Sequence, residues 1–158
     1  MDILRQLILY ITSFYLTLLP ANGYIEGVVG QPQSFLPTQA ITQNDRTISS
    51  LLFRGLFKYD NYGTLISDLA DDWQISEDGL EYTIKIRDDQ YWANGKKVTS
   101  NDIIYTSFKT KNLSDIATDR IDELTVRFTL PNRFSPFLDL LTAGIMLENS
   151  EENDDNLF

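Results

Sequence analysis

Two short segments of this chain alternate apolar and polar residues, and this alternation constrains the fold more tightly than any other feature. Successive side chains of a strand point to opposite faces of a sheet, so strict alternation predicts one buried face and one solvent face. The segments are Glu81–Arg87, with Tyr82, Ile84 and Ile86 inward, and Leu124–Leu130, with Leu124, Val126, Phe128 and Leu130 inward. The sequence therefore predicts two half-buried strands.

Two capping boxes mark predicted helix starts. Thr42 with Asp45, and Thr99 with Asp102, pair a hydroxyl and a carboxylate at the spacing where each accepts from a backbone N–H near the other. Residues at helical spacing follow both boxes, and Gly55 is placed to end the first helix. The shared faces consist of Ile48, Leu51 and Leu52 in the first helix, and of Ile103, Ile104, Ser107 and Phe108 in the second.

Turn residues separate the other predicted elements. Turns are expected at Asp60–Gly63, at Asp78-Gly79 and at Asn94-Gly95, and a short strand at Tyr24–Val29. A last helix would hold Pro136 in its first turn, where proline is tolerated. Its apolar face would consist of Phe134, Phe137, Leu138 and Leu141. Strands and helices do not alternate regularly, so we predict an α+β fold, a mixed sheet with flanking helices.

Residues 1–23 have the pattern of an export segment. Arg5 precedes the apolar stretch Leu7–Leu19, and small residues follow up to Gly23. This pattern is typical of a secretory signal peptide, cleaved here before Tyr24. Two alternatives stay open. One is an uncleaved membrane anchor, because the uncharged stretch just reaches the length that a bilayer needs, and the other is a buried core helix.

Composition excludes several kinds of site. The chain contains no Cys and no His. Disulfides, thiolate or imidazole metal sites, Cys nucleophiles and His general bases are therefore excluded within these residues, and we expect no cofactor. The net charge of −10 repels nucleic acid and anionic lipid surfaces, so we expect no nucleic-acid partner.

Acidic pairs offer the one route to an enzyme. Asp71-Asp72, Glu77-Asp78 and Asp88-Asp89 could divide acid and base roles between two carboxyl groups. Asp is favoured at turns because its side chain bonds nearby backbone, so we interpret the pairs as solvated carboxylates at turns and strand ends. Asp68–Asp78 lacks the alternating oxygen ligands of a calcium loop. We therefore expect no enzyme activity.

Aromatic residues gather in the middle of the chain, and two interpretations of them stay open. They form either a small aromatic core between sheet and helix or an aromatic wall around a ligand. Their spacing does not separate these possibilities. The residues are Phe57, Tyr59, Tyr62, Trp73, Tyr82, Tyr91 and Trp92.

The end of the chain is acidic. Residues 147–158 carry five carboxylates and no basic side chain, which predicts a solvated tail. The chain stops at Phe158 without a closing element, and we expect it to be interrupted there. The predicted organisation is thus an export segment (1–23), a partial domain (24–146) and the tail (147–158).

Read in order, the central motifs resemble the N-terminal signature of the family 5 extracellular solute-binding proteins, the peptide, oligopeptide and nickel receptors of ABC importers. An early loop around Ser34–Pro37 resembles that family's, with Leu36 where Asp is usual, and Asn94 stands where Asp usually precedes Gly. The motifs that carry the resemblance are Phe53-Arg54-Gly55-Leu56, Tyr59-Asp60, Gly63, Leu69-Ala70, Trp73, Ser76, Asp78-Gly79, Tyr82-Thr83, Ile86-Arg87, Trp92, Asn94-Gly95-Lys96, Thr99, Asp102, Tyr105, Ser107 and Phe108.

The resemblance implies the N-terminal part of a two-lobed, periplasmic-binding-protein-like fold (class II, peptide-binding type): the start of lobe I and its small subdomain. It implies a monomeric, non-enzymatic receptor outside the membrane that binds peptides or similar small solutes and delivers them to an ABC permease by lobe closure. Carried over to this sequence, the ligand-binding positions fall on Ile41, Thr42 and Gln43, whose backbone would pair with the peptide as an added strand. Capping of the following helix is a competing explanation for Thr42.

A rival hypothesis comes from a different class. The chain would then be a membrane-anchored, non-catalytic interaction or structural module that reuses this subdomain. A hydrophobic segment retained in the mature protein would favour it, whereas a mature chain starting at Tyr24 would favour a receptor free of the membrane.

Overall fold

The computed structural model describes residues 30–150. The chain divides into two units, Met1–Gly30 and Gln31–Phe158, and the description below concerns the second. The expected export segment (1–23), the expected strand Tyr24–Val29 and the tail beyond Ser150 lie outside the described residues.

The first part of the second unit is a short helical segment followed by a hairpin. The 3₁₀ turn η1 (Pro37–Gln39) leads into helix α2 (Gln43–Leu52). Strands β1 (Phe57–Tyr59) and β2 (Leu65–Ser67) then pair antiparallel. At the turn between them, Oδ1 of Asp60 accepts from the N–H groups of Tyr62 and Thr64, and Gly63 adopts a φ of 77°. This confirms the predicted hairpin.

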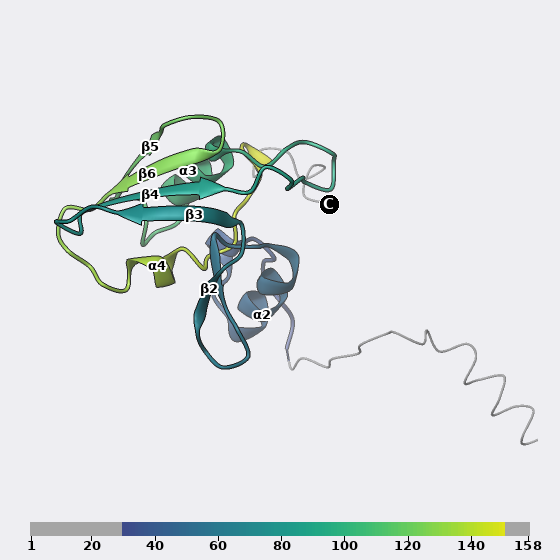
Figure 1. The fold of residues 1–158 in the computed structure, drawn as a ribbon. Helices are drawn as coiled ribbons and strands as arrows, with labels where there is room; N and C mark the ends of the chain where they lie inside the picture. Colours follow the sequence, from purple (N-terminus) through teal and green to yellow (C-terminus); the bar gives the residue numbers. More distant parts are fainter. Residues whose placement is uncertain (1–29, 151–158) are drawn as a thin grey trace, which may run out of the picture. The chain divides into compact units, whose positions relative to one another are not determined.

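A four-stranded sheet in the order β3-β4-β6-β5 follows (Figure 1). Its strands are β3 (Ala70–Ile75), β4 (Glu81–Ile86), β5 (Ala117–Arg120) and β6 (Thr125–Thr129). All pairings among the described strands are antiparallel, whereas we expected a mixed sheet. Helix α3 (Ser100–Lys109) packs against β5 and β6, and the single helical turn α4 (Phe137–Leu140) contacts β1. The α+β prediction is thus confirmed.

The core lies against one face of the sheet. In register, Tyr82 pairs with Phe128 and Ile84 with Val126, so the inward faces of β4 and β6 form one apolar surface. Phe137 closes this surface, with its ring centroid 4.6 Å from that of Tyr82. Ile84, Val126, Phe128 and Phe137 are fully buried, which confirms the two alternating strands.

Both capping boxes form. The N–H of Asp45 donates to Oγ1 of Thr42, and the N–H of Thr42 donates to Oδ2 of Asp45. At α3, the N–H of Thr99 donates to Oδ2 of Asp102. Each box satisfies N–H groups that have no partner within the first turn of a helix. The predicted helix starts are therefore confirmed.

Several predicted details are wrong, each for a tertiary reason. Helix α2 ends at Leu52, before Gly55, and Gly55 instead lies against backbone, where an added Cβ would be 2.6 Å from the carbonyl oxygen of Thr142. Ile103 and Ser107 of the predicted face of α3 are buried, but Phe108 is 73% exposed, because the helix buries Thr106 instead. Phe134 is also exposed, and the last helix is reduced to the single turn α4.

The two outer strands were not predicted. Strand β3 buries a single residue, Ala70, and β5 buries none. Apart from Ala70, the apolar side chains of β3 are limited to Trp73 and Ile75, which pair with Ile84 and Tyr82 but stay partly exposed, and β5 has no apolar alternation, so hydrogen bonding to β4 and β6 defines the two strands. Asp71 and Asp72 lie near the start of β3 and are exposed to solvent, as expected for solvated carboxylates at strand ends.

Candidate functional site

The three residues expected to contact a ligand lie at the start of α2. Ile41 is 73% exposed and Gln43 is exposed as the first residue of the helix. The backbone of Thr42 is engaged in capping, because its N–H donates to Asp45 and its carbonyl accepts from the N–H of Arg46. The segment is thus held in place by the helix it precedes, with an exposed apolar side chain at its front.

Asp45 fixes the loop before α2 as well as the helix start. Its side chain is fully buried, and Oδ1 accepts from the N–H of Gln33 at 2.8 Å while Oδ2 accepts from that of Thr42. These backbone hydrogen bonds, against the opposing effect of burial, lower the pKa of Asp45 to about 2. One carboxylate thereby positions both the loop around Gln33 and the Ile41–Gln43 segment.

A groove of about 620 Å³ opens beside this segment. Ala40 and Arg46, which flank Ile41–Gln43, line it, whereas the three residues themselves do not. Its other walls come from β1, from Phe53–Gly55 after α2 and from the segment 139–144. Its size falls within the range of small-molecule sites, which is about 300–1,000 Å³.

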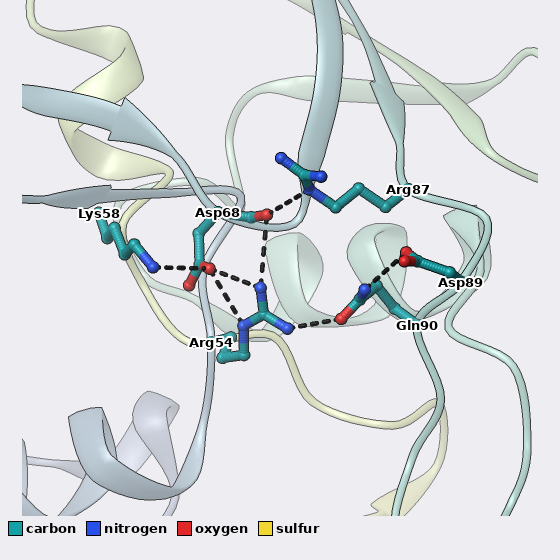
Figure 2. A network of polar contacts seen from close by, with 6 residues as sticks. All are labelled: Arg54, Lys58, Asp68, Arg87, Asp89 and Gln90. Carbon is teal, nitrogen blue, oxygen red and sulfur yellow. Dashed lines mark hydrogen bonds and ion pairs between the residues drawn. The ribbon is translucent and has the colours of Figure 1, made fainter.

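Arg54, Lys58 and Asp68, which line the groove, belong to a network of polar contacts (Figure 2). Oδ1 of Asp68, a residue 7% exposed, accepts from Nη2 of Arg54 at 2.6 Å and from Nζ of Lys58 at 3.2 Å. The backbone oxygen of Asp68 accepts from Nε of Arg87 at 3.0 Å. Nη1 of Arg54 also donates to Oε1 of Gln90. The network joins the β1–β2 hairpin to the segment that follows β4.

The electrostatics of the network favour its charged forms. Burial by itself would raise the pKa of Asp68, but hydrogen bonds from Arg54 and Lys58 outweigh burial and hold that pKa below its ordinary value. The pKa of Arg54 is raised by its hydrogen bond to Asp68. Also in the groove lining, the hydroxyl of Tyr59 donates to Oδ1 of Asp139, and this bond raises the pKa of the tyrosine.

The sequence did not single out this groove. In the sequence, Arg54 belongs to a family motif and Asp68 to a segment without calcium-loop ligands, and no pattern marks Lys58 or Asp139 as site residues. The four charges are separated in the sequence and meet because the hairpin and the segment around Asp139 fold together. A local motif search has no signal for such a cluster.

The central aromatic residues divide between core and surface. Phe57 and Tyr82 are buried, whereas Tyr62 is 93% exposed and Tyr91 is 64% exposed. Trp73 packs edge-on against Phe57, with ring centroids 5.1 Å apart. Neither a single aromatic core nor a continuous aromatic wall describes the whole set.

The acidic pairs do not form a cluster that could hold a metal. Within residues 30–150, no group of three or more Asp and Glu side chains has a metal-binding arrangement. Asp78 accepts from Oγ of Ser76 and from the N–H of Leu80, and these hydrogen bonds hold its pKa below the ordinary value.

None of the helices within residues 30–150 has the length and hydrophobicity that a membrane span requires.

Comparison with known proteins gives a consistent result. A family model described as bacterial extracellular solute-binding proteins, family 5 middle, matches residues 64–157. The oligopeptide-binding protein SarA of Streptococcus gordonii is 28% identical over 82% of this chain and 24% of its own length. The oligopeptide-binding protein AmiA of Streptococcus pneumoniae is 31% identical over 84% of this chain and 24% of its own length.

A solved structure agrees with these sequence matches. NikZ from Campylobacter jejuni, in complex with Ni(L-His), superposes with a TM-score of 0.75 at 30% identity. The match covers 88% of this chain and 30% of NikZ. The chain therefore spans about a quarter of the length of the two curated relatives and less than a third of this structural neighbour.

Proposed function

The chain belongs to the bacterial extracellular solute-binding proteins of family 5, and from this membership we propose that it is the substrate-binding component of an ABC importer. In this role it captures peptides or similar small solutes outside the membrane and delivers them to the permease. The observation that carries the proposal is the family match over residues 64–157, which spans more than half of the chain. The names of SarA and AmiA as oligopeptide-binding proteins support peptides as the ligand class.

The proposed mechanism is capture by closure of two lobes. Ligand binding shifts the population toward the closed form, which the permease recognises. Residues 30–150 would supply the beginning of one lobe and its small subdomain. The protein carries out no chemical step in this scheme, acts as a monomer and is exported.

Ile41, Thr42 and Gln43 are the proposed ligand contacts. A peptide lying along them would gain main-chain hydrogen bonds that do not depend on its sequence, together with apolar contact from the exposed side chain of Ile41. Because the N–H and carbonyl of Thr42 take part in capping, the main-chain bonds would come from its neighbours.

An uptake experiment tests the transport role. Cells that make the protein are compared with cells from which its gene has been deleted, using radiolabelled short peptides. We expect uptake to fall in the deletion strain and to return when the gene is restored. Unchanged uptake of every peptide tested would contradict the proposal.

The rival proposal of a membrane-anchored module has its own test. N-terminal sequencing of the mature protein distinguishes cleavage before Tyr24 from retention of residues 1–23. A start at Tyr24 supports the receptor, and a retained N-terminus in the membrane fraction supports the anchored module.

A further inference from the structure

The groove beside α2 has a charge opposite to that of the chain. Three cationic side chains line it, those of Arg46, Arg54 and Lys58, against the two carboxylates of Asp68 and Asp139. The chain as a whole has a net charge of −10. An excess of positive charge in a concave site of an acidic protein attracts anions locally.

Both carboxylates of the groove are already engaged. Asp68 is buried and accepts from Arg54 and Lys58, and Asp139 accepts from the hydroxyl of Tyr59. The cations, in contrast, remain accessible, because the side chains of Arg54 and Lys58 are 50% and 54% exposed. The groove therefore presents positive charge to solvent, whereas Asp68 is buried and Asp139 is hydrogen-bonded to Tyr59.

Donors are left over for a ligand. An ammonium group has three N–H donors, and one from Lys58 is directed at Asp68. A guanidinium has five, and among the described residues that of Arg46 makes one long contact, from Nε to the carbonyl of Ala40 at 3.5 Å. Hydrogen bonds from such donors to a carboxylate are charge-assisted and stronger than those between neutral groups.

We propose that this groove is a subsite for a carboxylate group, with Lys58 and Arg46 as its principal donors. The carboxylate belongs to an acidic peptide or to a free organic acid. This deepens the proposed solute-binding role, on which it rests, because it names the chemical class that the groove favours. The volume of about 620 Å³ accommodates the side chains of a short peptide.

A titration followed by nuclear magnetic resonance tests the subsite on the 158-residue chain. The probes are triglutamate and triglutamine, both with amidated C-termini, and glutarate, added to ¹⁵N-labelled protein at low salt. We expect triglutamate to give saturable shifts of the amide signals of Lys58, Thr142 and Gly144, with a dissociation constant on the order of 1 mM. Binding should weaken as salt is added, because exposed charges are screened.

The probes also separate the two sources of the carboxylate. Tighter binding of triglutamate than of glutarate assigns the subsite to acidic peptides, and equal binding assigns it to free organic acids. Triglutamine should bind at least several-fold more weakly than triglutamate. Equal binding of triglutamine, or no saturable shift with either acidic probe, would overturn the proposal.

Variants locate the binding. Lys58→Gln and Arg46→Gln should each weaken triglutamate binding by up to about fivefold, as expected for an exposed charged pair. Lys96→Gln removes the same charge from an exposed turn outside the groove and should leave binding unchanged. Equal losses in all three variants, or no loss in the first two, would contradict the assignment.

A substitution that should strengthen binding distinguishes an effect on the subsite from a loss of binding caused by misfolding. Asp139→Asn removes a negative charge from the groove and should tighten triglutamate binding by a few-fold. No gain would count against the subsite. The titration is independent of the uptake experiment, since uptake can fail while the subsite binds and the subsite can fail while uptake persists.

Discussion

The backbone N–H of Glu148 donates a 2.8 Å hydrogen bond to the carboxylate of Asp102, a residue 46 positions earlier in the chain. The same carboxylate accepts from the N–H of Thr99 at 2.8 Å and from Nε1 of Trp92 at 3.2 Å. Asp102 is 2% exposed. One buried side chain therefore joins the start of α3, the turn before it and the segment at the end of the described chain.

Asp102→Ala should lower the free energy of unfolding by about 3 kcal/mol, because it leaves buried N–H donors without an acceptor. Urea denaturation followed by circular dichroism measures the loss. Asp115→Ala, at an exposed position, is the matched control and should change stability by less than about 0.5 kcal/mol. Equal effects of the two substitutions would show that the Asp102 hydrogen bonds contribute no net stability.

Asp45 should contribute to the acid dependence of stability. Its folded-state pKa of about 2 lies below the ordinary value of 3.8, so its contribution is complete above the ordinary value and is lost as the pH falls toward 2. Thermal unfolding of the protein and of Asp45→Asn at several pH values measures this. The difference between the two should be largest above about pH 4 and should shrink toward pH 2. A constant difference across that range would contradict the assignment.

Gly55→Ala should destabilise the protein by about 3 kcal/mol, because the new Cβ would lie 2.6 Å from the carbonyl oxygen of Thr142 and force the backbone apart. Gly63→Ala is the comparison. Its φ of 77° disfavours alanine, but its Cβ would meet no atom within 4 Å, so we expect a cost of about 1 kcal/mol. Chemical denaturation of the two variants ranks the costs, and the reverse order would contradict the close approach of Gly55.

Asp68→Asn should destabilise the protein by about 1–2 kcal/mol. The substitution removes the anion that Arg54 and Lys58 share, but both cations are half exposed and water compensates part of the loss. Arg54→Gln should be less disruptive, since Lys58 stays paired with the carboxylate. Unfolding free energies of the two variants test this order. If Asp68→Asn left the free energy of unfolding unchanged, the network would not contribute to stability.

The 158-residue chain alone should bind short peptides weakly. It spans about a quarter of the length of the curated relatives, and closure of two lobes is the proposed source of tight binding. Calorimetry with mixed short peptides should detect no dissociation constant below about 1 μM. A tighter interaction would mean that residues 30–150 form a complete binding site.

The features predicted from sequence are those that local chemistry determines. The alternation around Ile84 and Phe128, the capping carboxylates Asp45 and Asp102, and the turn at Gly63 each depend on residues within a few positions of one another. The interactions that produce each feature lie within one short stretch of the chain. They therefore appear in the structure at the expected places.

The features that sequence did not predict depend on distant contacts. We expect Phe108 on the buried face of α3, but the helix is oriented so that Thr106 lies on that face. There its hydroxyl donates to the carbonyl of Asp102 and accepts from the N–H of Met146. Strands β3 and β5 exist because β4 and β6 offer them hydrogen bonds. The groove around Arg54 and Lys58 likewise exists only after the hairpin has folded against the segment around Asp139.

The strand order β3-β4-β6-β5 has a consequence for how the chain folds during synthesis. The β3–β4 hairpin is local and can form as soon as Ile86 has left the ribosome, whereas the inner pair β4–β6 must wait for Thr125–Thr129. Until then, one edge of β4 has no partner strand. A nascent chain paused between α3 and β6 would therefore expose the unpaired backbone N–H and C=O groups of β4. Chaperones should bind the chain most strongly at that stage.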